Sequence, residues 1–208
     1  MTWRFGLFDS TFAPLVSTHW ALLVALVFPL LMGGLAALFP PKRAWPVVLA
    51  SVPLLASGGV LLIAFQEAGL LGWQWEIAGL ILSLRLNGLS VLLLLTTQCI
   101  VVAAALYTPG HFRLTEPGPL ARWLWPLMGV ALSALSLIWL ATDLLTLYIA
   151  LELMGLAAVG MLMLSGKAPA LLAGMRYLLL ALVGSLTYLL GVALILGQWG
   201  RLDLQGLA

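Results

Sequence analysis

The segment ATDLLTLYIALELMGLAAVGML, residues 141–162, joins a short polar break to a long apolar run that carries one carboxylate near its centre, Glu152. Placing a charged side chain at the centre of a bilayer costs at least about 2.5 kcal/mol on insertion scales. An acid in such a run is therefore a candidate functional residue if the chain lies in a membrane. The rest of the sequence decides whether it does.

The composition is that of an integral membrane protein. Of the 208 residues, 63% are hydrophobic and 8% are charged, and several apolar stretches reach the length of about 20 residues that a bilayer-spanning helix requires. The nine Trp gather largely near the ends of those stretches, where amphipathic rings settle at the level of the headgroups. The predicted fold class is all-α, an integral membrane bundle of six transmembrane helices that forms one domain over residues 1–208.

Prolines, glycines and polar loops divide the chain into these six spans. The loop TPGHFRLTEPGPLARW separates the third span from the fourth, and ATD forms a tight turn in which Asp143 can cap the fifth helix. Between Gln66 and Leu86, polar, aromatic and β-branched residues alternate, which predicts a short extended or hairpin segment outside the hydrocarbon. The expected spans are residues 20–39, 46–65, 89–107, 124–141, 144–164 and 171–196.

Alternate loops carry unequal positive charge, which predicts an orientation. Loops on the cytoplasmic side of membrane proteins collect Lys and Arg. The side with more cations is therefore expected in the cytoplasm and both termini outside, in a multi-pass protein of a bacterial plasma (inner) membrane. The richer side has Lys42, Arg43, Arg113, Arg122, Lys167 and Arg176, and the poorer side has Arg4, Arg85 and Arg201.

The sequence also excludes several classes of function. Its cations are spread over short loops and form no basic patch, so nucleic acid is not an expected partner. One cysteine, Cys99, allows neither an intrachain disulfide nor a cysteine cluster for a metal. With no nucleotide-binding loop, we expect no cofactor, no metal and no catalytic residue, and the lipid bilayer as the surroundings.

Glu152 lies nine residues after Asp143, which is about 13 Å along a helix and close to the middle of a hydrocarbon layer about 30 Å thick. Tyr148 at i−4 can hydrogen-bond on the same face, and Gly155 at i+3 leaves room for a helix or a water. Desolvation favours the neutral acid there and a nearby cation favours the anion, so a moving or titrating cation would switch Glu152 between the two. That behaviour is typical of a proton relay, and the alternative is a protonated acid bonded to a neighbouring helix for packing.

The same segment resembles the fifth transmembrane helix of the antiporter-like subunits shared by respiratory complex I, membrane-bound hydrogenases and Mrp-type cation/proton antiporters, where an acid follows a DLL helix start by about this distance. Three more pieces resemble that family in the same order: LRLNGLSVLLLL resembles its entry to the third helix, GMRYLLLALVGSLTYLLGVALI its sixth helix, and GQWGRLDLQGLA the loop before its seventh. The resemblance covers about Gly79 to Ala208, and the first two spans match only in general character.

The resemblance implies a role for Glu152 as the fifth-helix acid of an ion path, with a charge state controlled by a lysine on the seventh helix. These subunits have about fourteen spans in two inverted five-helix repeats, so the six spans correspond to their N-terminal part. The chain departs from the pattern at Asn87, where the family often has Asp, and at Arg176, where a lysine is common. Arg176 near the cytoplasmic border is a candidate gating cation for Glu152, although its side chain can also snorkel to the interface.

We therefore expect a split or shortened antiporter-like subunit of a complex I-like oxidoreductase or of an Mrp-type antiporter, without a catalytic site of its own. Glu152 would move H⁺ or Na⁺ once partner membrane subunits, including one with the seventh-helix lysine, complete the path. Tyr148, Asp143 and Arg176 are its candidate modulators. The alternative is a scaffold subunit that fills a place in the complex and conducts nothing. A small proton-coupled importer is a third hypothesis, disfavoured because the six spans show no internal repeat and no second buried charge.

Overall fold

The computed structural model describes residues 26–31, 33–35, 71–77, 80–111 and 119–204. Most of the first expected span and all of the second lie outside these residues. The elements are β1 (Leu71–Ile77), β2 (Leu80–Leu86), α3 (Gly88–His111), α4 (Pro119–Leu140), α5 (Leu144–Met163) and α6 (Ala168–Trp199). A further helical segment covers residues 26–31 and 33–35.

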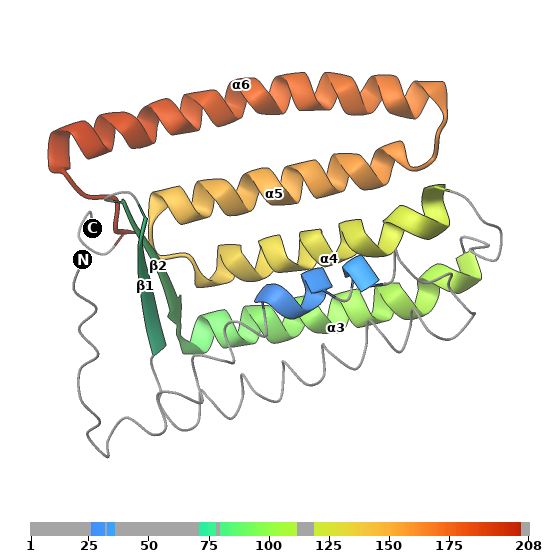
Figure 1. Cartoon of the computed structure of the whole chain (residues 1–208), viewed down its shortest axis with the longest axis horizontal. Helices are drawn as coiled ribbons and strands as arrows, with labels where there is room; N and C mark the ends of the chain where they lie inside the picture. The colour runs from blue at the N-terminus through green and yellow to red at the C-terminus, as the bar shows by residue number, and fades with distance from the viewer. Residues whose placement is uncertain (1–25, 32, 36–70, 78–79, 112–118, 205–208) are drawn as a thin grey trace, which may run out of the picture.

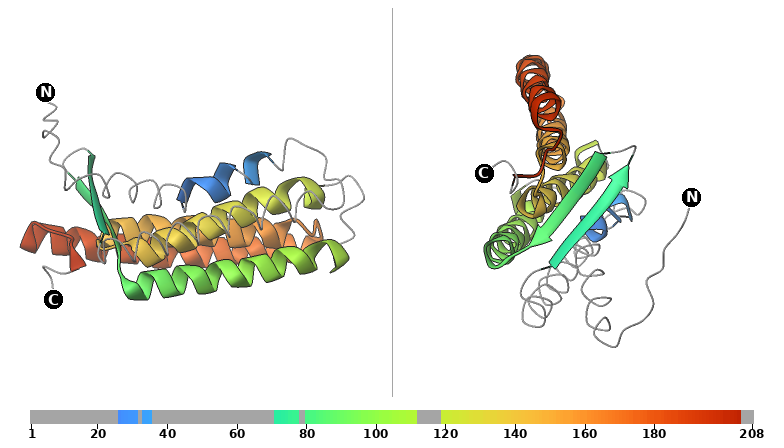
Figure 2. Two further views of the ribbon diagram at one scale, coloured as in Figure 1. Left: turned by 90° about the horizontal axis from the view of Figure 1, so that it is seen from below. Right: turned by 90° about the vertical axis from the view of Figure 1, so that its left-hand side faces the viewer.

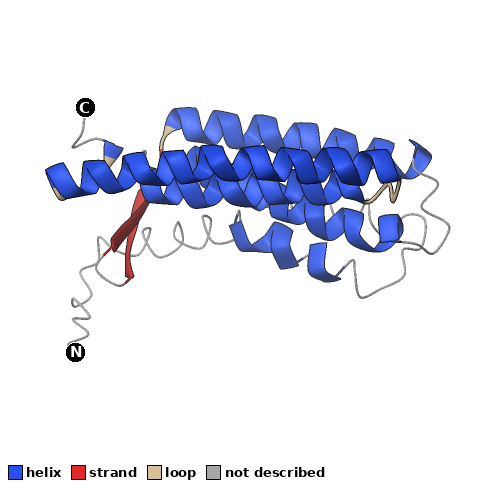
Figure 3. Cartoon of the chain, turned by 90° about the horizontal axis from the view of Figure 1, so that it is seen from above, coloured by secondary structure: helices blue, strands red, loops and turns tan. Residues whose placement is uncertain are grey.

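Helices α3 to α6 lie side by side in chain order, each roughly antiparallel to the next (Figure 1). Among the described elements, α4 contacts α3 and α5, and α6 contacts α5. The end-on view in Figure 2 shows the four helices as one curved layer with α6 at its edge, and Figure 3 shows that all four run along the same axis. All four are long and apolar enough to cross a membrane. The protein is therefore a multi-pass α-helical membrane protein.

The strands β1 and β2 form an antiparallel hairpin at one end of the helical layer, beside the start of α5 (Figure 1). This confirms the expected hairpin within residues 66–86. Asn87 follows β2 directly and caps α3, because its side-chain oxygen accepts a hydrogen bond of 2.8 Å from the Ser90 amide. A neutral Asn satisfies the first turn of a helix as well as Asp does, so capping alone explains the residue at this position.

Helices α4 and α6 both begin earlier in the sequence than expected. A proline at the first helical position gives up an amide that would be unpaired anyway. Pro119 therefore starts α4 within the segment expected to be a loop, and Pro169 lies in the first turn of α6. With 32 residues α6 is about 48 Å long, longer than a hydrocarbon layer of about 30 Å. It ends where Gly200 takes a left-handed conformation, with φ of 66°.

Asp143 is the centre of the junction between the hairpin and the helices. Its side chain is 1% exposed and accepts hydrogen bonds from the Ser83 amide (2.7 Å) and hydroxyl (3.3 Å) of β2. It also accepts from the Thr146 amide (2.7 Å) and hydroxyl (2.6 Å) in the first turn of α5. The expected helix cap at Asp143 is thus confirmed, and the same carboxylate reaches 60 residues back to β2.

The residues around Asp143 extend this junction to the chain segment that follows α6. The Thr142 amide donates to the Ser83 carbonyl (3.1 Å), and the Leu204 amide donates to the Thr142 carbonyl (2.9 Å). The Leu144 amide in turn donates to the Leu202 carbonyl (3.1 Å). The link between α4 and α5 therefore lies as an extended strand between β2 and residues 202–204.

The helical segment at residues 26–31 and 33–35 runs along α4 in the opposite direction, where two glycines allow close approach. The Ser133 hydroxyl donates to the Leu26 carbonyl at 2.7 Å. A Cβ atom at Gly129 would collide with the carbonyl oxygen of Pro29, and one at Gly33 would lie 2.9 Å from the Trp125 carbonyl oxygen. Backbone contact of this kind is how membrane helices pack without a hydrophobic driving force.

We predict that Asp143→Ala lowers the free energy of unfolding by about 3 kcal/mol, because it removes a helix cap and leaves the donors of Ser83 and Thr146 buried without an acceptor. The measurement is unfolding in mixed micelles by titration with sodium dodecyl sulfate. Thr187→Ala is the control, since the Thr187 hydroxyl bonds to the Val183 carbonyl of its own helix on an exposed face. Equal unfolding midpoints for the two variants would contradict a structural role for Asp143.

A second prediction concerns Gly129. Gly129→Ala should destabilise the protein by about 1–3 kcal/mol, because the added methyl group meets backbone that cannot move without separating two elements. Gly191→Ala in α6 is the matched control, since a Cβ there meets no atom within 4 Å and Ala is the better helix former. The same unfolding titration compares the two, and equal stability of both variants would show that the 26–35 segment does not lie against α4.

Candidate functional site

Glu152 lies in a groove between α5 and α6 with a volume of about 350 Å³. It is the ninth residue of α5, so it lies close to the middle of this candidate membrane span. Its side chain is partly buried. The groove is lined by Tyr148, Leu151, Glu152, Gly155 and Leu156 of α5 and by Tyr177, Leu178, Ala181, Leu182, Gly184, Ser185 and Tyr188 of α6.

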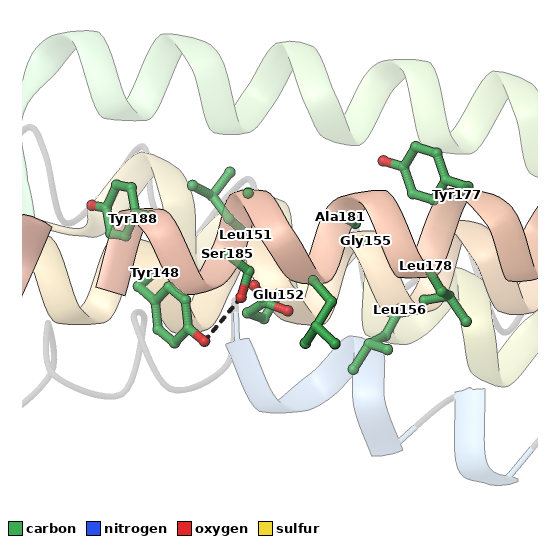
Figure 4. Close-up of a pocket in the computed structure, with 12 residues that line it drawn as sticks. Tyr148, Leu151, Glu152, Gly155, Leu156, Tyr177, Leu178, Ala181, Ser185 and Tyr188 are labelled. Carbon is green, nitrogen blue, oxygen red and sulfur yellow. Dashed lines mark hydrogen bonds between the residues drawn. The ribbon is translucent and has the colours of Figure 1, made fainter. Parts of the chain in front are cut away.

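Hydroxyl groups stand beside Glu152 at the end of the groove nearer the hairpin (Figure 4). The Tyr148 and Ser185 hydroxyls share a hydrogen bond of 3.1 Å, which joins α5 to α6. The Tyr188 hydroxyl donates to the Leu144 carbonyl at 3.1 Å, and its ring stacks on that of Tyr148 with centroids 5.8 Å apart. These contacts fix Tyr148 at one side of the Glu152 carboxylate.

Small residues leave the remainder of the groove open. A Cβ atom added at Gly155 or Gly184 would meet no atom within 4 Å, and Ala181 adds only a methyl group between them. Within the described part of the chain, the Glu152 carboxylate has no hydrogen bond or ion pair, and no Lys or Arg lines the groove. The acid thus has space beside it for water or for a side chain from another helix.

The structure separates the residues that the sequence grouped around Glu152. Tyr148 lies in the groove with it. Asp143 belongs to the hairpin junction, where its carboxyl group accepts hydrogen bonds from Ser83 and Thr146. Arg176 is exposed on α6 and is not among the residues that line the groove, so the structure does not bring it to Glu152.

Sequence reasoning missed Ser185 and Tyr188 as parts of the site. Both are polar residues in a stripe of small residues along α6, with Ala181, Gly184 and Gly191, a pattern typical of helix packing. That stripe would have revealed the site if it had been paired with the Tyr148 and Glu152 face of α5. Among the described residues, no group of three His, Cys, Asp or Glu side chains comes close enough to hold a metal ion.

Comparison with known proteins identifies the part of the chain that contains this groove. Residues 141–208 match the family described as NADH:quinone oxidoreductase/Mrp antiporter, transmembrane. The match covers 68 of the 208 residues, about a third of the chain. The resemblance drawn from the Glu152 segment is therefore confirmed, and α5 and α6 are antiporter-like helices.

Two archaeal proteins show how far the similarity extends. An uncharacterized protein of Methanocaldococcus jannaschii is 36% identical over 78 residues, which make up 38% of this chain and 16% of that protein. A chain in the structure of the membrane-bound sulfane sulfur reductase, an archaeal respiratory membrane complex, has the same fold, with a TM-score of 0.71 and 22% identity. The match covers 89% of this chain and 29% of that one, so the chain spans less than a third of the length of either protein. The second of these belongs to a membrane complex, and both are archaeal, so neither supports the bacterial membrane expected from the sequence.

The hydrogen bond between Tyr148 and Ser185 predicts an energetic coupling. A double-mutant cycle of Tyr148→Phe and Ser185→Ala should give a coupling of about 0.6 kcal/mol in the free energy of unfolding, the average for hydrogen bonds between membrane helices. Pairing Tyr148→Phe with Thr187→Ala is the control and should be additive. Additivity in both cycles would mean that the two hydroxyls do not meet in the folded protein.

Proposed function

We propose that this chain is an antiporter-like subunit of a multi-subunit respiratory membrane complex and that Glu152 relays a proton or another cation within it. One observation carries the proposal. A carboxyl group lies in the middle of a membrane-spanning helix, in a groove lined by hydroxyls, with no hydrogen bond or ion pair in the described part of the chain. A carboxyl group that served packing would instead be bonded to its neighbouring helix, and the hydroxyls nearest to Glu152 are bonded elsewhere.

The groove also indicates what completes the path. A carboxylate in hydrocarbon needs either a proton or a cation beside it, and the described cations lie outside the groove. We propose that the cation comes from a helix outside these 208 residues, packed against the open side of the groove. The wall formed by Gly155, Ala181 and Gly184 is small enough for such a helix to approach closely.

A scaffold without transport is the second candidate, and the exposure of α6 favours it. Only 11% of the α6 span is buried, so this helix offers a long apolar surface for assembly with other membrane helices. In that function Glu152 would stay protonated and bond to a partner helix. The two candidates differ in whether the acid must titrate.

Glu152→Gln tests the proposal in the complex purified from the membrane and reconstituted in vesicles, with cation or proton uptake followed by a fluorescent indicator. Transport should fall by about tenfold or more, because the amide keeps the size and hydrogen-bonding groups of the acid but holds no exchangeable charge. Glu152→Asp is the conservative control and should retain part of the transport. The subunit content of each complex, measured by mass spectrometry, shows whether assembly is intact.

The outcomes separate the candidates. Normal transport by an intact Glu152→Gln complex would refute the relay and leave the scaffold. Loss of assembly in Glu152→Ala, with normal assembly and transport in Glu152→Gln, would support the scaffold directly. A loss of transport in Arg176→Gln equal to that in Glu152→Gln would place the controlling cation on α6 and contradict its origin outside the chain.

A further inference from the structure

A second groove lies on the other side of α5, between α3, α4 and the end of α5, with a volume of about 630 Å³. Its wall is mostly apolar and includes Val101, Ala104, Met128, Ala131 and Leu135. Lys167 lines the same groove from the turn between α5 and α6. The ion path proposed above does not involve this groove, which is separated from Glu152 by the body of α5.

The polar groups of this groove gather at one end of it. Thr108 lies near the end of α3, Ser165 follows α5 and Lys167 precedes α6, and the antiparallel helices bring these three positions to the same end of the layer. Lys167 also occupies the N-cap of α6, so the positive end of that helix dipole adds to its charge. The apolar part of the groove therefore ends at a positively charged mouth at the border of the membrane.

The length of the groove corresponds to one leaflet of a bilayer. From Leu124 near the mouth to Leu135 at the deep end is eleven residues of α4, about 16 Å, and half of a hydrocarbon layer is about 15 Å. A transmembrane helix would need a surface that continues through both leaflets. A single lipid chain needs the depth of one, with its headgroup at the mouth.

We propose that this groove binds one anionic phospholipid, with an acyl chain between α3 and α4 and its phosphate beside Lys167. The charge at the mouth selects an anionic headgroup over a zwitterionic one, because Lys at a membrane surface attracts acidic lipids. Two lining methionines, Met128 and Met161, have flexible side chains that adapt to the shape of a lipid chain. The lysine side chain is exposed and long enough to follow the phosphate at the interface.

The test measures which lipids stay bound to the complex purified in mild detergent and incubated with equal amounts of phosphatidylglycerol and phosphatidylcholine that carry the same acyl chains. Native mass spectrometry counts the retained lipids. The wild type should retain phosphatidylglycerol preferentially. Lys167→Gln should lower this preference about fivefold, the effect of one cation near an acidic membrane surface, whereas Lys167→Arg should keep it.

Two further variants test the groove itself. Ala131→Phe should fill the second groove and lower the retention of both lipids. Ala181→Phe places the same ring in the groove of Glu152 and should leave lipid retention unchanged. Arg176→Gln removes an exposed cation from α6 outside both grooves and is the matched control for Lys167→Gln. Lys167→Gln changes no buried packing, so the headgroup test stands even if Ala131→Phe does not fold.

Three results would overturn the proposal. One is a wild-type complex without a preference for phosphatidylglycerol. Another is an equal loss of that preference in Arg176→Gln and Lys167→Gln, which would show a diffuse surface charge. The third is a photo-crosslinking amino acid at Ala104 that attaches to a protein chain, which would show that a partner helix fills the groove. Attachment of this probe to phosphatidylglycerol would instead support the proposed lipid site.

Discussion

The buried carboxylate of Asp143 is the interaction on which the arrangement of the helices depends. It accepts four hydrogen bonds, two from Ser83 and two from Thr146, and hydrogen bonds to an ionised acceptor are roughly twice as strong as neutral ones. These bonds fix where α5 begins relative to the hairpin. Because α5 begins there, Tyr148 and Glu152, one and two turns further along, have defined positions against α6. The position of Glu152 relative to the hairpin is thus set by the polar junction at the start of α5.

The junction also shows what the hairpin contributes to the helical layer: it pairs with the backbone of the link between α4 and α5. The link between α4 and α5 is extended and would expose unpaired amides and carbonyls on both edges. Ser83 of β2 pairs with one edge, and Leu202 and Leu204 pair with the other. Three segments far apart in the sequence thereby satisfy one another, and the segment after α6 is held next to the start of α5. Helix α6 then contacts α5 along its length and closes one side of the Glu152 groove.

Much of this arrangement could be predicted from the sequence, and the part that could not has a physical reason. Apolar runs and breaks reveal helices and their order, and an Asp before LLT is a local signal for a cap. The partner of that Asp is 60 residues away, and no local pattern identifies Ser83. The start of α4 was missed because Pro119 was assigned to a loop, although the first turn of a helix accommodates proline, as it also does at Pro169 in α6. Glu152 was visible from its chemistry alone, whereas Ser185 and Tyr188 required the register of α5 against α6.

Small residues on two faces of α5 have opposite effects: on one face they allow tight packing, and on the other they leave the groove open. At Ala150 and Ala157 the small side chains are fully buried within the described structure, which is tight helix packing. At Gly155 the missing side chain instead leaves open space in the groove beside Glu152. Within the described structure, the tightly packed face of α5 and the face that carries its one carboxyl group are therefore different. The groove of about 350 Å³ has room for a side chain of another helix or for several waters beside the Glu152 carboxyl group.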